Sequence, residues 1–119
     1  MLVTKTFEFS ASHFLTKYHG KCEHLHGHNY TLEVSVVGKV RSDDLVEDFV
    51  VIKDIVKEKI MSQIDHTHLN DRFENPSAEV VAVWIWEQLE KDLNLYEIKL
   101  WETSNSFVTY RGPDGFHRP

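Results

Sequence analysis

The segment from Asn29 to Lys39 constrains the fold more than any other, because its side chains alternate regularly between apolar and polar. This two-residue period is typical of a β-strand with one face in the core. Side chains two residues apart on a strand point the same way, so His26 and His28 continue the apolar face at the start of the strand. Two histidines on one face can share a metal ion. The apolar members of the face are Tyr30, Leu32, Val34 and Val36.

A zinc ion is the partner that such histidines suit. Imidazole nitrogens bind zinc, and a catalytic zinc typically keeps three protein ligands and leaves one position for water or substrate. We predict His13 as the third ligand, because it ends the first apolar segment, which can fold back beside the second. Two alternatives remain open. The histidines could lie on the surface without a ligand, or Cys22 could join His26 and His28 in a closed structural zinc site.

Composition limits the class of protein. A chain of 119 residues, 41% hydrophobic and 27% charged, fits one globular domain over residues 1–119. Its small size favours a site shared between subunits. The net charge of −6 and thirteen scattered Lys and Arg residues argue against a nucleic-acid surface. Without a signal sequence or a membrane-spanning apolar run, we expect a cytoplasmic protein with no membrane partner.

The predicted elements occur in the order strand, strand, helix, helix, strand, strand. This order indicates an α+β protein with a four-stranded antiparallel sheet and two helices on one face. The tail from Gly112 to Pro119 is rich in helix and strand breakers and is expected to be loosely held. The predicted ranges are strands Leu2–Ser10, Asn29–Lys39, Tyr96–Thr103 and Phe107–Arg111, and helices Phe49–Gln63 and Asn75–Leu93.

Both predicted helices begin at a residue suited to capping. Asp48 precedes the first helix, and an N-cap role explains this residue better than a catalytic one. Asn75 is the predicted cap of the second helix, with Pro76 tolerated in its first turn. Glu79 then lies where the helix macrodipole favours a carboxylate.

Other polar residues are candidates for acid–base chemistry. Cys22 is the only cysteine, so it is either an inert buried thiol or a reactive one. Asp65 and His66 adjoin in a polar segment after the first helix, a pattern that is more often loop structure than catalysis. Glu102 continues the apolar parity of its strand. An inward carboxylate at a strand end is costly to bury unless it has partners or a task.

Taken together, these motifs resemble the 6-pyruvoyltetrahydropterin and 6-carboxytetrahydropterin synthase family over nearly the whole chain. The resemblance implies the tunnelling fold, in which subunits form trimeric barrels that stack as a homohexamer, with sites at subunit interfaces. That assembly would also cover exposed strand edges. The motifs are Phe9-Ser10-Ala11-Ser12-His13, Cys22 with His26-Gly27-His28-Asn29-Tyr30, Asp48-Phe49, Asp65-His66 with Leu69-Asn70, Asn75-Pro76-Ser77-Ala78-Glu79 and Glu102-Thr103.

The resemblance also implies a substrate, a cofactor and residue roles. The substrate is 7,8-dihydroneopterin triphosphate, and the cofactor is Zn²⁺, which polarises side-chain oxygens so that a thiolate can remove the adjacent proton. Glu102 becomes a second carboxylate near the reacting side chain. The implied zinc ligands are His13, His26 and His28, and the implied acid–base groups are Cys22, Asp65 and His66.

Glu79 matches the residue that anchors the pterin in this family, where a carboxylate accepts two parallel N–H donors. Ser77, Ala78 and Thr103 are the neighbouring substrate contacts that the resemblance implies. Ala78 departs from the family, which usually keeps Ser or Thr there, so a hydroxyl contact is lost while a backbone contact can persist. Weaker candidates for triphosphate contacts are His19, Lys21 and His24.

The interval between Cys22 and His26 distinguishes two branches of the family. Three residues separate them, which resembles the 6-carboxytetrahydropterin synthase pattern, whereas the pyruvoyl branch usually has a longer interval. The carboxy branch implies loss of triphosphate and acetaldehyde and a place in 7-deazapurine synthesis, such as that of queuosine. The alternatives are the pyruvoyl-forming enzyme, a tri-histidine zinc hydrolase, and a non-enzymatic zinc-stabilised domain with Cys22 as fourth ligand.

Overall fold

The computed structural model describes residues 1–115 and contains one five-stranded sheet in the order β3-β1-β2-β4-β5. Neighbouring strands are antiparallel except for β3, which pairs parallel to β1. The predicted four-stranded antiparallel sheet is therefore wrong by one strand. A strand of two residues is too short to leave an alternating pattern in the sequence. The strands are β1 (Leu2–His13), β2 (His26–Val37), β3 (Thr67–His68), β4 (Leu95–Thr103) and β5 (Ser106–Tyr110).

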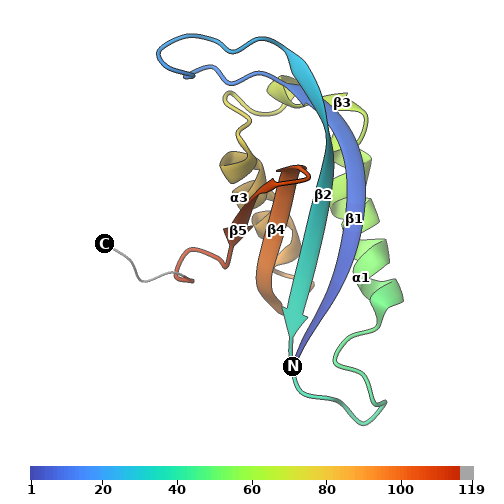
Figure 1. The fold of residues 1–119 in the computed structure, drawn as a ribbon. Coiled ribbons are helices and arrows are strands. Elements are labelled where there is room, and N and C mark those ends of the chain that lie inside the picture. Colours follow the sequence, from blue (N-terminus) through green and yellow to red (C-terminus); the bar gives the residue numbers. More distant parts are fainter. Residues whose placement is uncertain (116–119) are drawn as a thin grey trace.

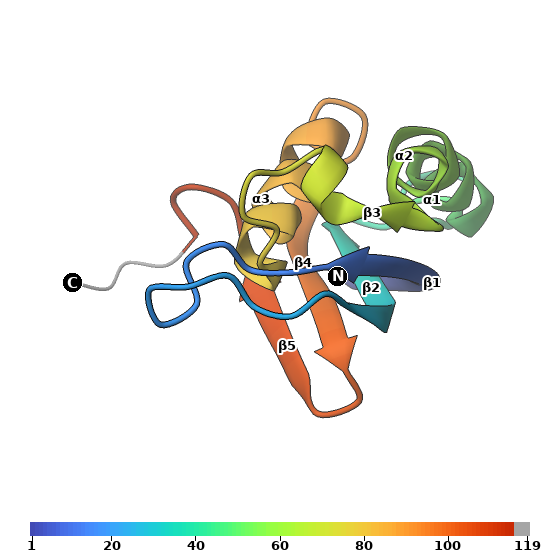
Figure 2. The same cartoon turned by 90° about the horizontal axis from the view of Figure 1, so that it is seen from above.

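The helices cover one face of the sheet, as predicted (Figures 1 and 2). The first predicted helix is confirmed as a continuous run of three segments, with a π-helical turn in the middle. Asp48 is its N-cap, and its carboxylate accepts a hydrogen bond from the Val50 amide at 2.8 Å. The segments are α1 (Phe49–Val56), η1 (Lys57–Met61) and α2 (Ser62–Ile64), followed by the 3-10 turn η2 (Leu69–Asp71) and by α3 (Ala78–Leu89).

The start of α3 differs from the prediction. Ser77, not Asn75, is the N-cap, and its hydroxyl accepts a hydrogen bond from the Val80 amide at 3.2 Å. The Asn75 side chain instead accepts from the Thr16 amide at 2.8 Å. Both residue types are good caps, so the sequence alone could not choose between them. Pro76 consequently lies outside the helix, where its carbonyl is available to other partners.

The core lies between the sheet and the helices. The predicted apolar face of β2 is confirmed, because its side chains are almost completely buried. The core face of β1 carries Phe9, Ala11 and His13, and His13 is only 1% exposed. A buried imidazole needs polar partners, so this end of the sheet is a candidate functional site. The four buried residues of the β2 face are Tyr30, Leu32, Val34 and Val36.

The first two strands are longer toward the site than predicted. The first strand extends to His13, the second begins at His26, and the two residues pair across the strands. Residues 14–25 connect them in a long loop beyond the end of the sheet (Figure 1). The loop turns tightly at His19 and Gly20, which both have positive φ angles, and Tyr18 and Lys21 exchange backbone hydrogen bonds there.

The prediction of a loosely held tail is wrong at Gly112. This residue is buried against Trp86 with a φ of 85°. The last part of that prediction concerns residues 116–119, which lie outside the described residues. Across residues 1–115, the helices lack the combination of length and apolar character needed to cross a membrane.

Candidate metal centre

Three imidazole rings meet at the paired ends of β1 and β2. The strand register places His13 opposite His26, and His28 follows on the same face. Nε2 of His13 lies 3.1 Å from Nε2 of His26, close to the spacing of about 3.3 Å for two nitrogens on one tetrahedral zinc. One ring nitrogen from each residue lies within 4.8 Å of the others. The structure thus brings together the three predicted ligands.

Backbone carbonyls orient two of the rings. Nδ1 of His13 donates to the Pro76 carbonyl at 2.8 Å, and Nδ1 of His26 donates to the His24 carbonyl at 2.8 Å. A neutral imidazole that donates from Nδ1 presents the lone pair of Nε2. Carbonyl partners of this kind commonly fix metal-binding histidines. Both Nε2 atoms therefore face the cluster in the form that binds a metal.

The third ring supports a metal site independently. Nε2 of His28 is buried and has no hydrogen-bond partner within residues 1–115. A buried polar atom without a partner is costly, and a bound cation would satisfy it. Burial also lowers the pKa of His28, although the nearby Glu102 opposes this shift. The neutral, metal-binding form of the ring is thereby favoured. The cluster is consistent with a metal site.

Glu102 lies beside the cluster, and its side chain points inward, as the parity of its strand predicts. Its carboxylate oxygens are 3.6 Å from Nε2 of His28 and 3.9 Å from Nε2 of His13. The side chain is 31% exposed, so it borders both the histidine cluster and solvent. A carboxylate in this position adds negative charge next to a bound cation and can also accept hydrogen bonds from a ligand.

A pocket of about 220 Å³ opens next to Glu102. It combines the N-terminus of α3 with the end of β4 and the start of β5, so Ser77, Ala78 and Glu79 share one cavity with Glu102. Thr103, predicted as a substrate contact, does not line this pocket, and its hydroxyl donates to Asn105 at 2.9 Å. The remaining lining residues are Leu15, Ser106, Phe107 and Val108.

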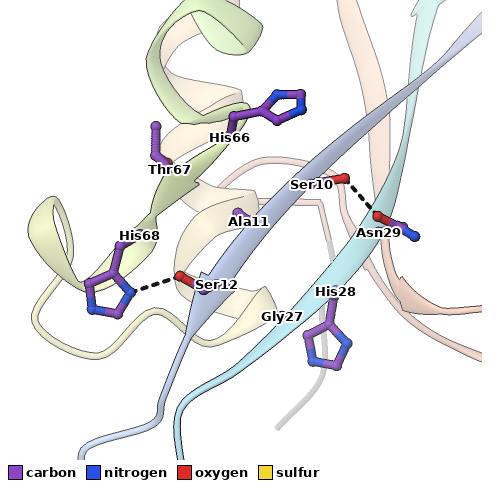
Figure 3. A pocket seen from close by; sticks show the side chains of 9 residues that line it. All are labelled: Ser10, Ala11, Ser12, Gly27, His28, Asn29, His66, Thr67 and His68. Atoms are coloured by element: carbon purple, nitrogen blue, oxygen red, sulfur yellow. Dashed lines mark hydrogen bonds between the residues drawn. The ribbon is translucent and has the colours of Figure 1, made fainter.

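Asp65 and His66 form a pair at the β3 edge of the sheet. Their side chains approach to 3.0 Å, between Oδ1 of Asp65 and Nδ1 of His66. The His66 ring is 81% exposed. This edge lies across β1 from β2, which carries His26 and His28. His66 also lines a pocket of about 570 Å³ that is shown in Figure 3.

The loop between β1 and β2 carries the remaining predicted residues. Cys22 has an exposed, free thiol, and it does not belong to the group of metal-ligating atoms found within residues 1–115. His19, Lys21 and His24 are exposed on the same loop. The structure therefore separates Cys22 from the ligand set and leaves its thiol accessible.

Sequence reasoning missed Glu23, which follows Cys22 directly. Its carboxylate accepts a hydrogen bond from the Leu15 amide at 3.2 Å and lies 3.9 Å from Nδ1 of His26. It also missed the Pro76 carbonyl as a partner of His13. The position of Glu23 directly after Cys22 would have been enough to name it as a candidate. No local pattern connects Pro76 to a histidine that lies 63 residues away.

The fold and the site together define an α+β protein whose sheet gathers three histidines into a candidate metal centre. Its Glu102 and Glu79 open onto one adjacent pocket. Residues 2–113 match the 6-pyruvoyl tetrahydropterin synthase family, and the chain belongs to this family. Its general class is accordingly that of a pterin synthase family lyase.

Relatives from both branches of the family are similar to the chain. It is 38% identical to the 6-pyruvoyl tetrahydrobiopterin synthase of Dictyostelium discoideum over 94% of this chain and 96% of that protein. It is 32% identical to the 6-carboxy-5,6,7,8-tetrahydropterin synthase of Haemophilus influenzae over 92% of this chain and 97% of that protein. These similarities establish the family but leave the branch unresolved.

A third relative and a solved structure extend the comparison. The dihydroneopterin monophosphate aldolase of Pyrococcus furiosus is 38% identical over 67% of this chain and 72% of that protein. The structure of Caenorhabditis elegans 6-pyruvoyl tetrahydropterin synthase superposes with a TM-score of 0.83. The two sequences are 26% identical, and the superposition covers 94% of this chain and 95% of the Caenorhabditis elegans chain. The likeness extends over nearly all of the fold.

Proposed function

We propose that this chain is a zinc-dependent 6-carboxy-5,6,7,8-tetrahydropterin synthase. It converts 7,8-dihydroneopterin triphosphate with loss of triphosphate and acetaldehyde, in 7-deazapurine biosynthesis of the queuosine type. The observation that supports this most is the convergence of His13, His26 and His28, with Nε2 of His28 buried and unpaired within the described part of the chain. Three imidazoles with an open fourth position form the usual ligand set of a catalytic zinc.

Zinc held by these histidines would supply a Lewis acid that makes the proton next to a side-chain oxygen of the substrate more acidic. Cys22 is the base that removes this proton. Its thiol is exposed on the loop that leads directly into His26, so it can reach a substrate beside the cluster. General base catalysis of this kind typically contributes about 10²- to 10⁴-fold to a rate.

Asp65 and His66 transfer the complementary proton. Asp65 holds Nδ1 of His66 at 3.0 Å, which leaves the other ring nitrogen free in solvent. Because the pair lies at a sheet edge, we assign it to a site formed with a neighbouring subunit in a hexamer of two trimers. The family resemblance supports this placement, and so does the small size of the chain.

The pocket that Glu79 and Glu102 line, beside the histidine cluster, holds the pterin ring. Glu79 accepts two N–H donors from the 2-amino group and the ring nitrogen, at about 1.5 to 3 kcal/mol for each charge-assisted bond. The Ser77 hydroxyl already caps α3, and Ala78 has no hydroxyl, so backbone groups make the remaining contacts at this helix start. Glu102 lines the same pocket and contacts the reacting side chain of the substrate, and Thr103, which follows it in the sequence, is a further substrate contact that the family resemblance supports.

The three-residue interval between Cys22 and His26 supports the carboxy branch over the pyruvoyl branch. Incubation of the zinc-loaded protein with 7,8-dihydroneopterin triphosphate, followed by mass spectrometry of the products, tests this assignment. We expect 6-carboxytetrahydropterin and acetaldehyde in equal amounts. A pyruvoyl product without acetaldehyde would show that the chain is a 6-pyruvoyl tetrahydropterin synthase instead. No turnover by fully loaded protein would contradict both.

A second candidate reaction is an aldol cleavage of the dihydroneopterin side chain, favoured by the position of Glu23. This carboxylate lies 3.9 Å from the ring of His26, and the relative from Pyrococcus furiosus is named an aldolase. Glu23 would take the proton of a side-chain hydroxyl while the adjacent carbon–carbon bond breaks. The departing carbon becomes an aldehyde, and the carbon left on the pterin gains a proton.

The two reactions can be separated in the same product assay. Aldol cleavage leaves a hydroxymethyl group on the pterin and releases no acetaldehyde. Replacement of Glu23 by Gln should abolish the hydroxymethyl product if the carboxylate is the base, and should leave acetaldehyde formation intact. A Glu23→Gln variant that still forms the hydroxymethyl product at the wild-type rate would exclude this role.

A further inference from the structure

The segment that carries Asp65 and His66 is attached to the sheet through very little backbone. It leads into β3, which is two residues long and pairs with Ala11 and Ser12 of β1. A strand this short forms few backbone hydrogen bonds, so its position also depends on the contacts that flanking residues make with β1. The residues that make these contacts, Asp65 and His68, lie on either side of His66 in the sequence.

The backbone of His66 is itself in an unfavourable conformation. Its φ angle is 61°, in the left-handed region, where a Cβ atom lies too close to the backbone. On the N-terminal side, Ser10 holds the turn through two hydrogen bonds. The His66 amide donates to the Ser10 carbonyl at 2.7 Å, and the Ser10 amide donates to Asp65 Oδ1 at 3.0 Å.

On the C-terminal side, the contact is between two side chains. The Ser12 hydroxyl lies 3.0 Å from Nδ1 of His68, and the His68 ring packs on Phe14 with the centroids 5.9 Å apart. Figure 3 shows this hydrogen bond passing from β1 to β3, while the His66 ring points away from both. The exposed His66 ring is held by Asp65 at 3.0 Å, and Asp65 belongs to the same turn, so the direction of the ring depends on the backbone of that turn.

We propose that Ser12 and His68 are positioning residues that hold the backbone of His66 in its left-handed conformation. This inference rests on the proposed function, because it takes His66 as an acid–base group. His13 follows Ser12 directly, and strand alternation sends the two side chains to opposite faces. One strand therefore orients a metal ligand on its core face and holds the acid–base turn at its edge.

Activity measurements test the role of the pair. Ser12→Ala and His68→Phe, which keeps a ring on Phe14, should each lower kcat about tenfold through misplacement of His66. We expect KM and metal content to stay unchanged, and the double variant to lose no more than either single one. Ser12→Thr keeps the hydroxyl and should restore kcat.

The matched control is Ser35→Ala. It removes another hydroxyl contact between strands, with Thr4 at 2.6 Å, away from the Asp65–His66 turn, and should leave kcat unchanged. If kcat in Ser12→Ala equals the wild-type value, or falls only in proportion to metal content, the positioning role is wrong.

Hydrogen exchange of the His66 amide measures the same contact without any turnover. We expect this amide to exchange about tenfold faster in Ser12→Ala than in wild type, and at the wild-type rate in Ser35→Ala. Faster exchange in a protein that shows no turnover would leave the positioning role intact and refute the proposed function. An unchanged exchange rate at His66 in Ser12→Ala would overturn the positioning role itself.

Discussion

At the scale of single residues, His13 connects the cluster of three histidines to the start of α3. One ring nitrogen donates to the Pro76 carbonyl and the other faces His26. We predict that His13→Ala reduces bound metal from about one ion per chain to nearly none. It should also destabilise the fold by about 2 to 3 kcal/mol, because it leaves a cavity and an unpaired buried carbonyl.

Elemental analysis of folded protein and denaturant unfolding measure these two effects. His24→Ala is the control, because its imidazole is exposed and the substitution keeps the backbone carbonyl that accepts from His26. This control should keep its metal and its stability. Full metal content in His13→Ala would show that the cluster is not the metal site.

Cys22 distinguishes an enzyme from a zinc-stabilised domain. If the thiol is the base, Cys22→Ala should keep its metal and lose at least about 100-fold in turnover. If the thiol were a fourth ligand, metal content would fall together with stability. Elemental analysis and the product assay on one preparation separate these outcomes, and unchanged turnover would exclude the catalytic role.

The site could be predicted from the sequence where it depends on strand parity. His26, His28 and Glu102 continue the apolar faces of their strands, so alternation alone predicts that each side chain points inward, while their meeting also needs the pairing of β2 with β4. Glu23 and the Pro76 carbonyl could not be predicted in the same way. Their partners are set by the path of a long loop and by the position of the Ser77 cap, and neither follows from a periodic pattern.

At the scale of elements, Gly112 fixes the end of β5 against α3. Its φ angle is 85°, and a Cβ atom added there would lie 2.8 Å from the Trp86 ring. We predict that Gly112→Ala destabilises the protein by about 2 to 4 kcal/mol, from backbone strain together with a steric clash. Thermal unfolding measures this loss.

Gly20→Ala is a matched control for Gly112→Ala. Gly20 has a similar φ of 81°, but an added Cβ would meet nothing within 4 Å. The Gly20→Ala substitution should lower the free energy of unfolding only by the backbone strain, about 1 to 2 kcal/mol. Equal losses in both variants would mean that the contact between Gly112 and Trp86 contributes nothing.

The long elements were predictable and the short ones were not. The helix that begins at Phe49 and the strand that contains Tyr30 have enough turns or alternations to define their period. By contrast, β3 consists of Thr67 and His68, too short to show any period. The parallel pairing of β3 arises from tertiary contacts with β1, so sequence reasoning gave four strands where the structure has five.

At the scale of the whole molecule, β5 ends one side of the sheet and the short β3 ends the other. Long unpaired edges are normally covered in stable proteins. Together with the family resemblance, this leads us to predict a hexamer built from two trimers. Native mass spectrometry should give six times the chain mass of 14.0 kDa. A monomer at micromolar concentration would contradict a site shared between subunits.

Metal dependence of turnover tests directly whether the three histidines hold a catalytic zinc. The three histidines are proposed to hold the zinc that activates 7,8-dihydroneopterin triphosphate, so protein stripped of metal should form no product. One equivalent of zinc per chain should restore 6-carboxytetrahydropterin formation in wild type but not in His13→Ala. Product formation at the same rate before and after metal removal would show that turnover does not depend on this metal.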